Sequence, residues 1–264
     1  PILKRNMSTL IRYAYWRLRG YAKADGYRIS DRLKAPWLFR NAFLQCSGAQ
    51  MATLSQIKDQ PYVFYPLHAE PEKSLQALSP EYFFQLETIA AIARDLPTGV
   101  KLVVKEHLFA LGRRPRDYYG QIRAFKNVVF VDVREFGLEL VRHAKAVVTI
   151  SSTAGLEACY LGKPVITFGQ HNMYNFMDNV RVLSSPHELR SALLDALRAE
   201  SEGRYSAVEG ERLKRAIQKS SFDMGGFTEM AMDDIETDAI DEAFSSFVQS
   251  VQEFGAWSDQ AEAA

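Results

Sequence analysis

Short apolar segments alternate with amphipathic segments through the middle of the chain. β-branched and aromatic residues gather at 62–65, 101–105, 128–131, 146–150 and 165–168, and each run has the length of a buried strand. Between these runs, apolar residues recur at helical spacing over 79–96, 115–125, 135–144 and 154–161. The alternation predicts an α/β fold in which helices cover both faces of a parallel sheet, with right-handed crossovers.

The two ends of the chain lack this alternation. We expect a helical amino-terminal segment over 1–58, the α/β domain over 59–220, and an acidic helical tail over 221–264. Helices are predicted at 186–200, 206–219 and 240–254. The first 40 residues carry ten Lys and Arg against Asp25 and Asp31, and no Lys or Arg follows Lys219. The formal net charge is zero, so nothing global indicates a nucleic-acid partner.

The segment from Leu10 to Arg19 mixes aromatic residues and arginines at helical spacing. Two interpretations stay open: the helix lies on a membrane surface, or it packs on the domain that follows. No apolar run approaches the roughly 18 residues needed to span a bilayer. The chain begins with Pro1 rather than Met, and we expect it to be part of a longer protein. Two cysteines, Cys46 and Cys159, indicate a reducing compartment and no disulfide framework.

A hydroxyl-rich turn follows the strand at 146–150. Ser151, Ser152 and Thr153 stand where the next helix begins, and Gly162 ends that helix. A helix N-terminus of this kind presents N–H groups to a phosphate-sized anion. The same residue types are also good helix N-caps. The local pattern leaves both interpretations open.

Polar residues also follow the other strands, at the edge where ligands of parallel sheets bind. His68, Glu70 and Glu72 follow the first strand and suit acid–base work, or belong to a solvated loop. Lys105 ends the second strand and His107 follows it. The two suit a phosphate or a ribose, or are an exposed lysine and a strand-end cap. Glu157, one helical turn after Thr153, suits a ribose hydroxyl or an ion pair with a lysine. A loop carries Arg113, Arg114 and Arg116. It either binds an anionic sugar or phosphate or is simply solvated.

Several classes of protein lack support in the sequence. No Gly-x-Gly-x-x-Gly follows the first strand, and there is no P-loop, which argues against a dinucleotide enzyme and an NTPase. No Gly-x-Ser-x-Gly elbow marks a nucleophilic serine. The histidines lack metal-ligand spacing, and no Asp-x-Asp pair is present, so we expect no metal and no cofactor.

Five motifs in order resemble the bacterial capsule polysaccharide biosynthesis and surface carbohydrate export family, over about residues 60–185. They are Tyr65-Pro-Leu-His-x-Glu-Pro-Glu-x-Ser74, Val104-Lys-Glu-His107, Asn127-Val-Val-Phe-Val131, Thr149-Ile-Ser-Ser-Thr-Ala-Gly-Leu-Glu-Ala158, and Gly162-Lys-Pro-Val-Ile-Thr-Phe-Gly169 with Tyr174. The family includes Kdo transferases that use a CMP-linked donor. The resemblance implies the Rossmann-like, donor-binding carboxyl-terminal half of a GT-B glycosyltransferase.

The resemblance also implies roles for individual residues. His107 would contact the nucleotide, Ser151, Ser152 and Thr153 the donor phosphate, and Glu157 the ribose or base, with Lys105 nearby. Glu70, Glu72 and Ser74 would line the acceptor side, with Glu70, Glu72 and His68 as catalytic candidates. Leu108 stands where the family usually has proline, and only one of two GT-B halves is visible.

The implied activity is metal-free displacement at the anomeric carbon of a nucleotide sugar. The acceptor would be a saccharide or lipid-linked molecule, and the place of action the cytoplasm or the inner face of the cytoplasmic membrane. A CDP-linked polyol-phosphate transferase and a non-catalytic nucleotide-sugar-binding or regulatory module are the alternatives.

Overall fold

A computed structural model describes residues 2–20, 29–70, 75, 79–219 and 221, with six further residues between 244 and 252. Glu72, Ser74 and most of the helix predicted over 240–254 lie outside the described residues. The chain divides into two compact units, Pro1–Ala207 and Val208–Ala264. Among the described residues of the second unit, the named element is the helix α10 (Ala207–Lys219), which begins at the boundary between the units.

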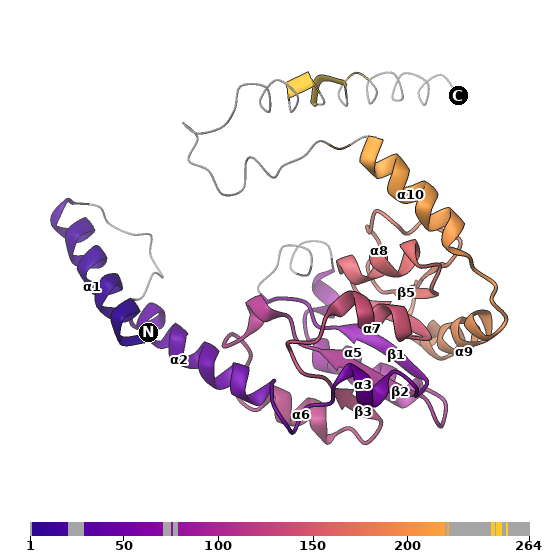
Figure 1. The fold of residues 1–264 in the computed structure, drawn as a ribbon, viewed down its shortest axis with the longest axis horizontal. Coiled ribbons are helices and arrows are strands. Elements are labelled where there is room, and N and C mark those ends of the chain that lie inside the picture. The colour runs from indigo at the N-terminus through magenta and orange to yellow at the C-terminus, as the bar shows by residue number, and fades with distance from the viewer. Residues whose placement is uncertain are drawn as a thin grey trace. The chain divides into compact units, whose positions relative to one another are not determined.

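The described residues of the first unit contain one six-stranded parallel sheet (Figure 1). Its strand order is β3-β2-β1-β4-β5-β6. The first strand is central, β2 and β3 are added on one side of it, and β4, β5 and β6 are added on the other. The predicted α/β fold is confirmed. β6 was not predicted, because three residues at a sheet edge carry too little apolar pattern to identify a strand. The strands are β1 (Tyr62–Pro66), β2 (Lys101–Lys105), β3 (Val128–Phe130), β4 (Ala146–Thr149), β5 (Val165–Thr167) and β6 (Val180–Val182).

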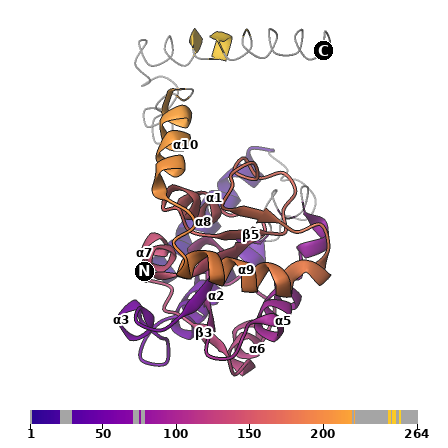
Figure 2. The ribbon, with the colours of Figure 1, turned by 90° about the vertical axis from the view of Figure 1, so that its right-hand side faces the viewer.

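Helices cover both faces of the sheet (Figure 2). α5 (Gln85–Asp95) packs against α6 (Tyr118–Ala124) and α9 (Leu189–Ser201), whereas α7 (Gly137–His143) packs against α8 (Thr153–Tyr160). Right-handed crossovers explain why the helices divide between the two faces. Connections that add strands on one side of β1 must lie on the opposite face from those that add strands on its other side. The central strands β1, β2 and β4 are almost fully buried, as this double cover requires.

The helix predicted over 79–96 is in fact divided. A 3₁₀ turn, η1 (Pro80–Tyr82), precedes α5, and the chain bends at Phe84, whose ψ of 78° is not helical. The sequence does not show this break because it serves a distant contact: Gln85, the first residue of α5, binds the main chain of His68. Two further 3₁₀ turns are η2 (Leu108–Ala110) and η3 (Pro186–Glu188), and α3 spans Leu54–Ile57.

The amino-terminal segment is helical, as expected. α1 (Ile2–Leu18) lies beside α2 (Ile29–Gln45), where Asn6 Nδ2 donates to Leu33 O at 3.1 Å. The carboxyl end of α2 joins the core of the sheet domain through Ala42 and Cys46. None of the residues of α1, all of which the structure describes, is buried. α1 therefore packs on α2 and leaves its apolar side chains exposed.

Among the described residues, no helix is both long and apolar enough to cross a membrane. Cys46 and Cys159 are buried free thiols, and burial raises the pKa of each to about 12. Gly112 allows α2 to approach the loop after β2. Its φ is +80°, and a Cβ there would lie 2.7 Å from the backbone nitrogen of Phe39.

Candidate functional site

The turn after β4 is held by bonds from within the protein. Ser151 N–H donates to His68 Nε2 at 3.0 Å, and Ser152 N–H donates to Thr149 Oγ1 at 3.1 Å. Thr149 Oγ1 in turn donates to Ser152 Oγ at 2.8 Å. Ser152 occupies the N-cap position of α8, but within the described residues its side chain makes no capping bond. Plain capping therefore does not explain this hydroxyl-rich turn.

The N–H groups available to a ligand begin at Thr153, after the two serines whose N–H groups are engaged. Gly155 N–H donates to Ser152 O at 3.1 Å. The first N–H groups of a helix have no intrahelical acceptor, which leaves those of Thr153 and Ala154 at the mouth of α8. With the positive end of the helix dipole behind them, these two donors suit a phosphate oxygen. The exposed hydroxyl of Thr153 stands beside them.

The loop after β5 supports this turn from behind. Tyr174 is 3% exposed, and its hydroxyl donates to Ser152 O at 3.0 Å. Its ring lies directly over Gly155, where a Cβ would fall 2.3 Å from Tyr174 Oη. Asn172 Nδ2 donates to Ile150 O at 3.0 Å from the same loop. Glycine at 155 is therefore required by the close approach of the tyrosine.

His68 is a support of the turn rather than an exposed acid–base group. It is 3% exposed, and its Nδ1 lies 3.3 Å from Gln85 Oε1 while Nε2 accepts from Ser151. A proton on Nδ1 and a lone pair on Nε2 satisfy both contacts. Burial is the main cause that lowers the pKa of His68 to about 4, so the ring is neutral at pH 7. This environment does not favour the predicted catalytic role.

Arg114 and Glu106 form a buried ion pair at the end of β2. Arg114 Nε and Nη2 lie 2.7 and 2.8 Å from the two carboxylate oxygens, and the side chains are 2% and 0% exposed. Nη2 also donates to His68 O at 2.6 Å, and Nη1 lies 2.9 Å from Glu70 Oε1. The guanidinium rests 5.0 Å from the ring centre of Tyr118. One arginine thus ties the ends of β1 and β2 to the loop after η2.

Glu70 is occupied by this network. Its carboxylate pairs with Arg114 and accepts a hydrogen bond from Gln85 Nε2. A base must have a free lone pair directed at its substrate, so the structure does not favour Glu70 in that role. Glu72, the third catalytic candidate, lies outside the described residues, as does Ser74.

The residues predicted to bind the nucleotide have freer side chains. His107 is exposed, and its Nδ1 accepts from Phe109 N–H at 3.3 Å, which leaves a proton on Nε2 for a ligand oxygen. Lys105 Nζ donates to Glu106 O at 3.2 Å, and burial lowers the pKa of this lysine. Burial raises the pKa of Glu157. A carboxyl of this kind, perturbed inside a cleft, is typical of ligand sites.

A single cavity of about 480 Å³ gathers these candidates at the carboxyl edge of the sheet. We call it the sheet-edge cavity. It collects side chains from after β1, from after β2, from the turn after β4 and from the second turn of α8. Glu70 is not part of its wall. The predicted residues that line it are His68, Lys105, His107, Ser151, Ser152, Thr153 and Glu157.

Other polar residues at strand ends have structural partners. Asp132, after β3, accepts from Gly48 N–H at 2.9 Å and from Arg134, whose ion pair holds the pKa of that carboxyl well below its usual range. Lys163, just before β5, pairs with Glu200 of α9 at 2.8 Å. Within the described part of the chain, no group of three or more His, Cys, Asp or Glu is placed to hold a metal ion.

Sequence reasoning missed two supports of the site. Gln85 carried no signal, because nothing local distinguishes a glutamine that begins a helix from one on its surface. Tyr174 belonged to a motif without an assigned task. Arg114 was considered as an anion ligand, and its pairing with Glu106, eight residues away, was not predicted.

Comparisons with known proteins show the family of the chain. The family described as "Capsule polysaccharide biosynthesis protein" matches residues 13–178. Protein FixF of Sinorhizobium fredii is 31% identical over 134 residues, which are 50% of this chain and 32% of FixF. The chain thus spans about a third of that relative.

Two solved structures are similar at low sequence identity. The UDP-GlcNAc 2-epimerase from Methanocaldococcus jannaschii matches with a TM-score of 0.44 and 14% identity, over 69% of this chain and 49% of that one. The Thermosulfurimonas dismutans KpsC beta Kdo 2,4 transferase matches with a TM-score of 0.37 and 20% identity, over 64% of this chain and 56% of that one.

Proposed function

Since this chain belongs to the capsule polysaccharide biosynthesis family, we propose that it is the donor-binding part of a glycosyltransferase that uses a nucleotide-activated sugar. One observation carries the proposal: all six residues expected to contact the nucleotide line the sheet-edge cavity. These residues come from the ends of two separate strands, β2 and β4, and from the helix α8. Such convergence at the switch point of a parallel sheet is typical of nucleotide sites.

The proposed chemistry is direct displacement at the anomeric carbon. The N–H groups of Thr153 and Ala154, with the Thr153 hydroxyl, would hold the donor phosphate. As the glycosidic bond breaks, negative charge grows on the leaving phosphate, and fixed donors stabilise that charge without reorganising. His107 Nε2–H would donate to the same phosphate or to a ribose hydroxyl, and Glu157 would accept from the ribose.

The base that deprotonates the acceptor hydroxyl is assigned to none of the described residues in this proposal. His68 accepts from the turn after β4, and Glu70 is paired with Arg114. The resemblance to Kdo transferases favours CMP as the nucleotide. A CDP-linked donor would indicate a polyol-phosphate transferase, and binding without transfer a regulatory module.

Titration calorimetry with CMP, CDP and UDP tests the proposal. We expect CMP to bind, and Thr153→Ala to weaken its binding by about tenfold or more without abolishing it, because hydrogen bonds to charged groups contribute about 1.5–3 kcal/mol and the backbone donors remain. Thr153 is exposed, so the variant should fold normally. Lys126→Ala, at an exposed lysine outside the cavity lining, is the control and should bind CMP as the wild type does. If none of the three nucleotides binds, the proposed function is wrong.

A further inference from the structure

Two further cavities continue from the sheet-edge cavity, and each shares lining residues with the one before it. A bridging cavity of about 640 Å³ has Leu108 and Phe109 in common with the sheet-edge cavity. A hairpin cavity of about 480 Å³, between α1 and α2, has Arg5 and Ala35 in common with the bridging cavity. The shared residues place the three hollows in a row that runs from the α1–α2 hairpin to the proposed donor site.

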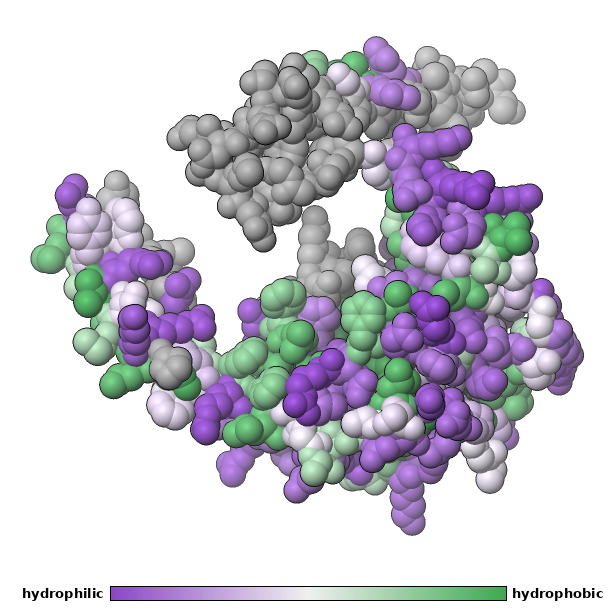
Figure 3. All heavy atoms as spheres, viewed as in Figure 1, coloured by the Kyte–Doolittle hydropathy of each residue, from purple (hydrophilic) through white to green (hydrophobic). Residues whose placement is uncertain are grey.

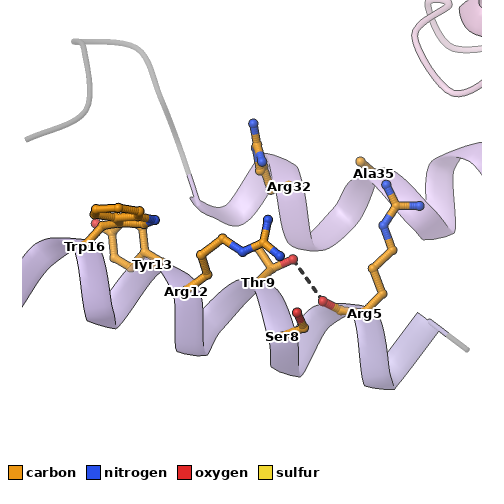
Figure 4. Close-up of a pocket in the computed structure, with 8 residues that line it drawn as sticks. All are labelled: Arg5, Ser8, Thr9, Arg12, Tyr13, Trp16, Arg32 and Ala35. Atoms are coloured by element: carbon orange, nitrogen blue, oxygen red, sulfur yellow. Dashed lines mark hydrogen bonds between the residues drawn. The ribbon is translucent and has the colours of Figure 1, made fainter. Parts of the chain in front are cut away.

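The wall of the hairpin cavity combines cations, hydroxyls and aromatic rings (Figure 4). Arg5 and Arg12 extend from α1 toward α2, and Tyr13 and Trp16 lie together at one end. Among the described residues that line the cavity there is no carboxylate. The remaining wall is formed by Ser8, Thr9, Arg32 and Ala35.

The bridging cavity continues the positive charge. Arg5, Arg40 and Arg113 line it against one acid, Asp31, and the exposed rings and chains of Leu108 and Phe109 form its apolar side. Across the described residues, none of Arg5, Arg12, Arg40 and Arg113 forms an ion pair with a carboxylate. In the part of the chain that the structure describes, these four charges therefore have no carboxylate partner.

This combination suits a chain of acidic sugars. The guanidinium fork matches a carboxylate or phosphate with two parallel hydrogen bonds. A Trp or Tyr ring offers a flat apolar surface to the C–H face of a sugar ring while its polar edge stays hydrated. Hydroxyl side chains such as Ser8 can exchange hydrogen bonds with sugar hydroxyls.

An anionic membrane surface is the competing occupant, since α1 carries several basic residues and no acidic one. The surfaces differ in position, however. The exposed apolar residues Leu3, Met7 and Ile11, which a bilayer would take up, line none of the three cavities. Figure 3 shows hydrophilic residues beside hydrophobic ones on the hairpin. The arginines face hollows that lead to the sheet edge, which suits an extended solute better than a planar bilayer.

We propose that the hairpin and bridging cavities form an acceptor track that binds an acidic oligosaccharide and leads its end to the donor site. The inference rests on the proposed function, because it names the acceptor of that reaction. It predicts that affinity depends on the negative charge of the sugar and on arginines far from the nucleotide.

Titration of the full chain with an oligogalacturonate tests the track, with the fully methyl-esterified oligomer as the uncharged counterpart. The variant is Arg5→Gln with Arg12→Gln. We expect it to bind the oligogalacturonate at least about tenfold more weakly, since a lost charge-assisted bond of 1.5 kcal/mol is about tenfold in Kd. The esterified oligomer should bind the wild type weakly, and its affinity should be the same for the wild type and for the variant.

Arg116→Gln with Arg190→Gln is the matched control. It removes the same charge from exposed positions outside the cavities and should leave the affinity for oligogalacturonate within about twofold, because distant surface charges are screened at physiological salt. Both double variants should bind CMP as the wild type does. If the wild type does not bind CMP, the proposed function is refuted. If it binds CMP but not oligogalacturonate, only the acceptor track is refuted.

Vesicles separate the two occupants. Phosphatidylglycerol and phosphatidylcholine vesicles are offered to the wild type and to the Arg5→Gln, Arg12→Gln variant. Arginine-dependent binding to phosphatidylglycerol without binding of oligogalacturonate would overturn the proposal in favour of a membrane surface. Equal weakening by the two double variants would also overturn it, because the effect would then be one of net charge.

Discussion

Replacing Arg114 should destabilise the fold more than any surface arginine does. Arg114→Met keeps most of the side-chain volume and removes the charge. Glu106 would then be left 0% exposed, without the two guanidinium contacts at 2.7 and 2.8 Å that satisfy its oxygens. Main-chain His107 N–H would remain as one donor to it, at 2.6 Å.

The burial decides the magnitude. Exposed ion pairs contribute about 0–1 kcal/mol, whereas removal of one partner from a buried pair costs about 3–5 kcal/mol because a charge is left in low dielectric. At 2% and 0% exposure, the Arg114–Glu106 pair belongs to the second class. Contacts of Arg114 to His68 O and to the Tyr118 ring favour the upper half of that range. With a urea m-value of about 2 kcal/mol/M, the midpoint should fall by about 2 M.

Urea unfolding followed by circular dichroism provides the assay, with two comparisons. Arg142→Met breaks an exposed pair with Glu139 and should cost less than about 1 kcal/mol. Glu106→Gln with Arg114→Met should recover part of the loss, because the double variant buries no unpaired charge. If Arg114→Met costs no more than Arg142→Met, or if the double variant equals the sum of the singles, the pair is not the buried support described here.

Two further predictions concern the turn after β4. Gly155→Ala should destabilise the protein by about 1–3 kcal/mol by overpacking, since its Cβ would lie 2.3 Å from Tyr174 Oη. The control, Gly137→Ala in α7, has open space around it and should be neutral or stabilising. Equal urea midpoints for the two variants would contradict the close approach of Tyr174 to Gly155. His68 has a folded pKa of about 4 against 6.5 in the unfolded chain, so between these values the unfolded state binds the extra proton and stability falls as pH falls. From pH 7 to pH 5 the wild type should lose about 2 kcal/mol from this group, and His68→Gln should lack that loss in unfolding curves at the two pH values; an unchanged slope would refute the buried neutral ring.

Local pattern was sufficient for the elements that build the sheet. The strands at the centre are continuous apolar runs because both faces are covered, and such runs are visible without any knowledge of neighbours. Their parallel arrangement brought the strand ends to one edge, so residues as distant as His107 and Ser151 were predicted to meet, and they line one cavity. Gly162 was expected to end α8, and it has the positive φ of +64° that this position favours.

Only the tertiary structure decided what the polar residues at that edge do. His68, Glu70 and Arg114 carried the same sequence signal as His107, yet packing turned the first three toward one another and left His107 exposed. Whether a polar residue near a strand end is free or engaged depends on partners that are distant in the sequence. Arg114 and His68, for example, are 46 positions apart. Residue type and spacing therefore determined where the site lies, while burial and long-range pairing determined which of its residues remain available to a ligand.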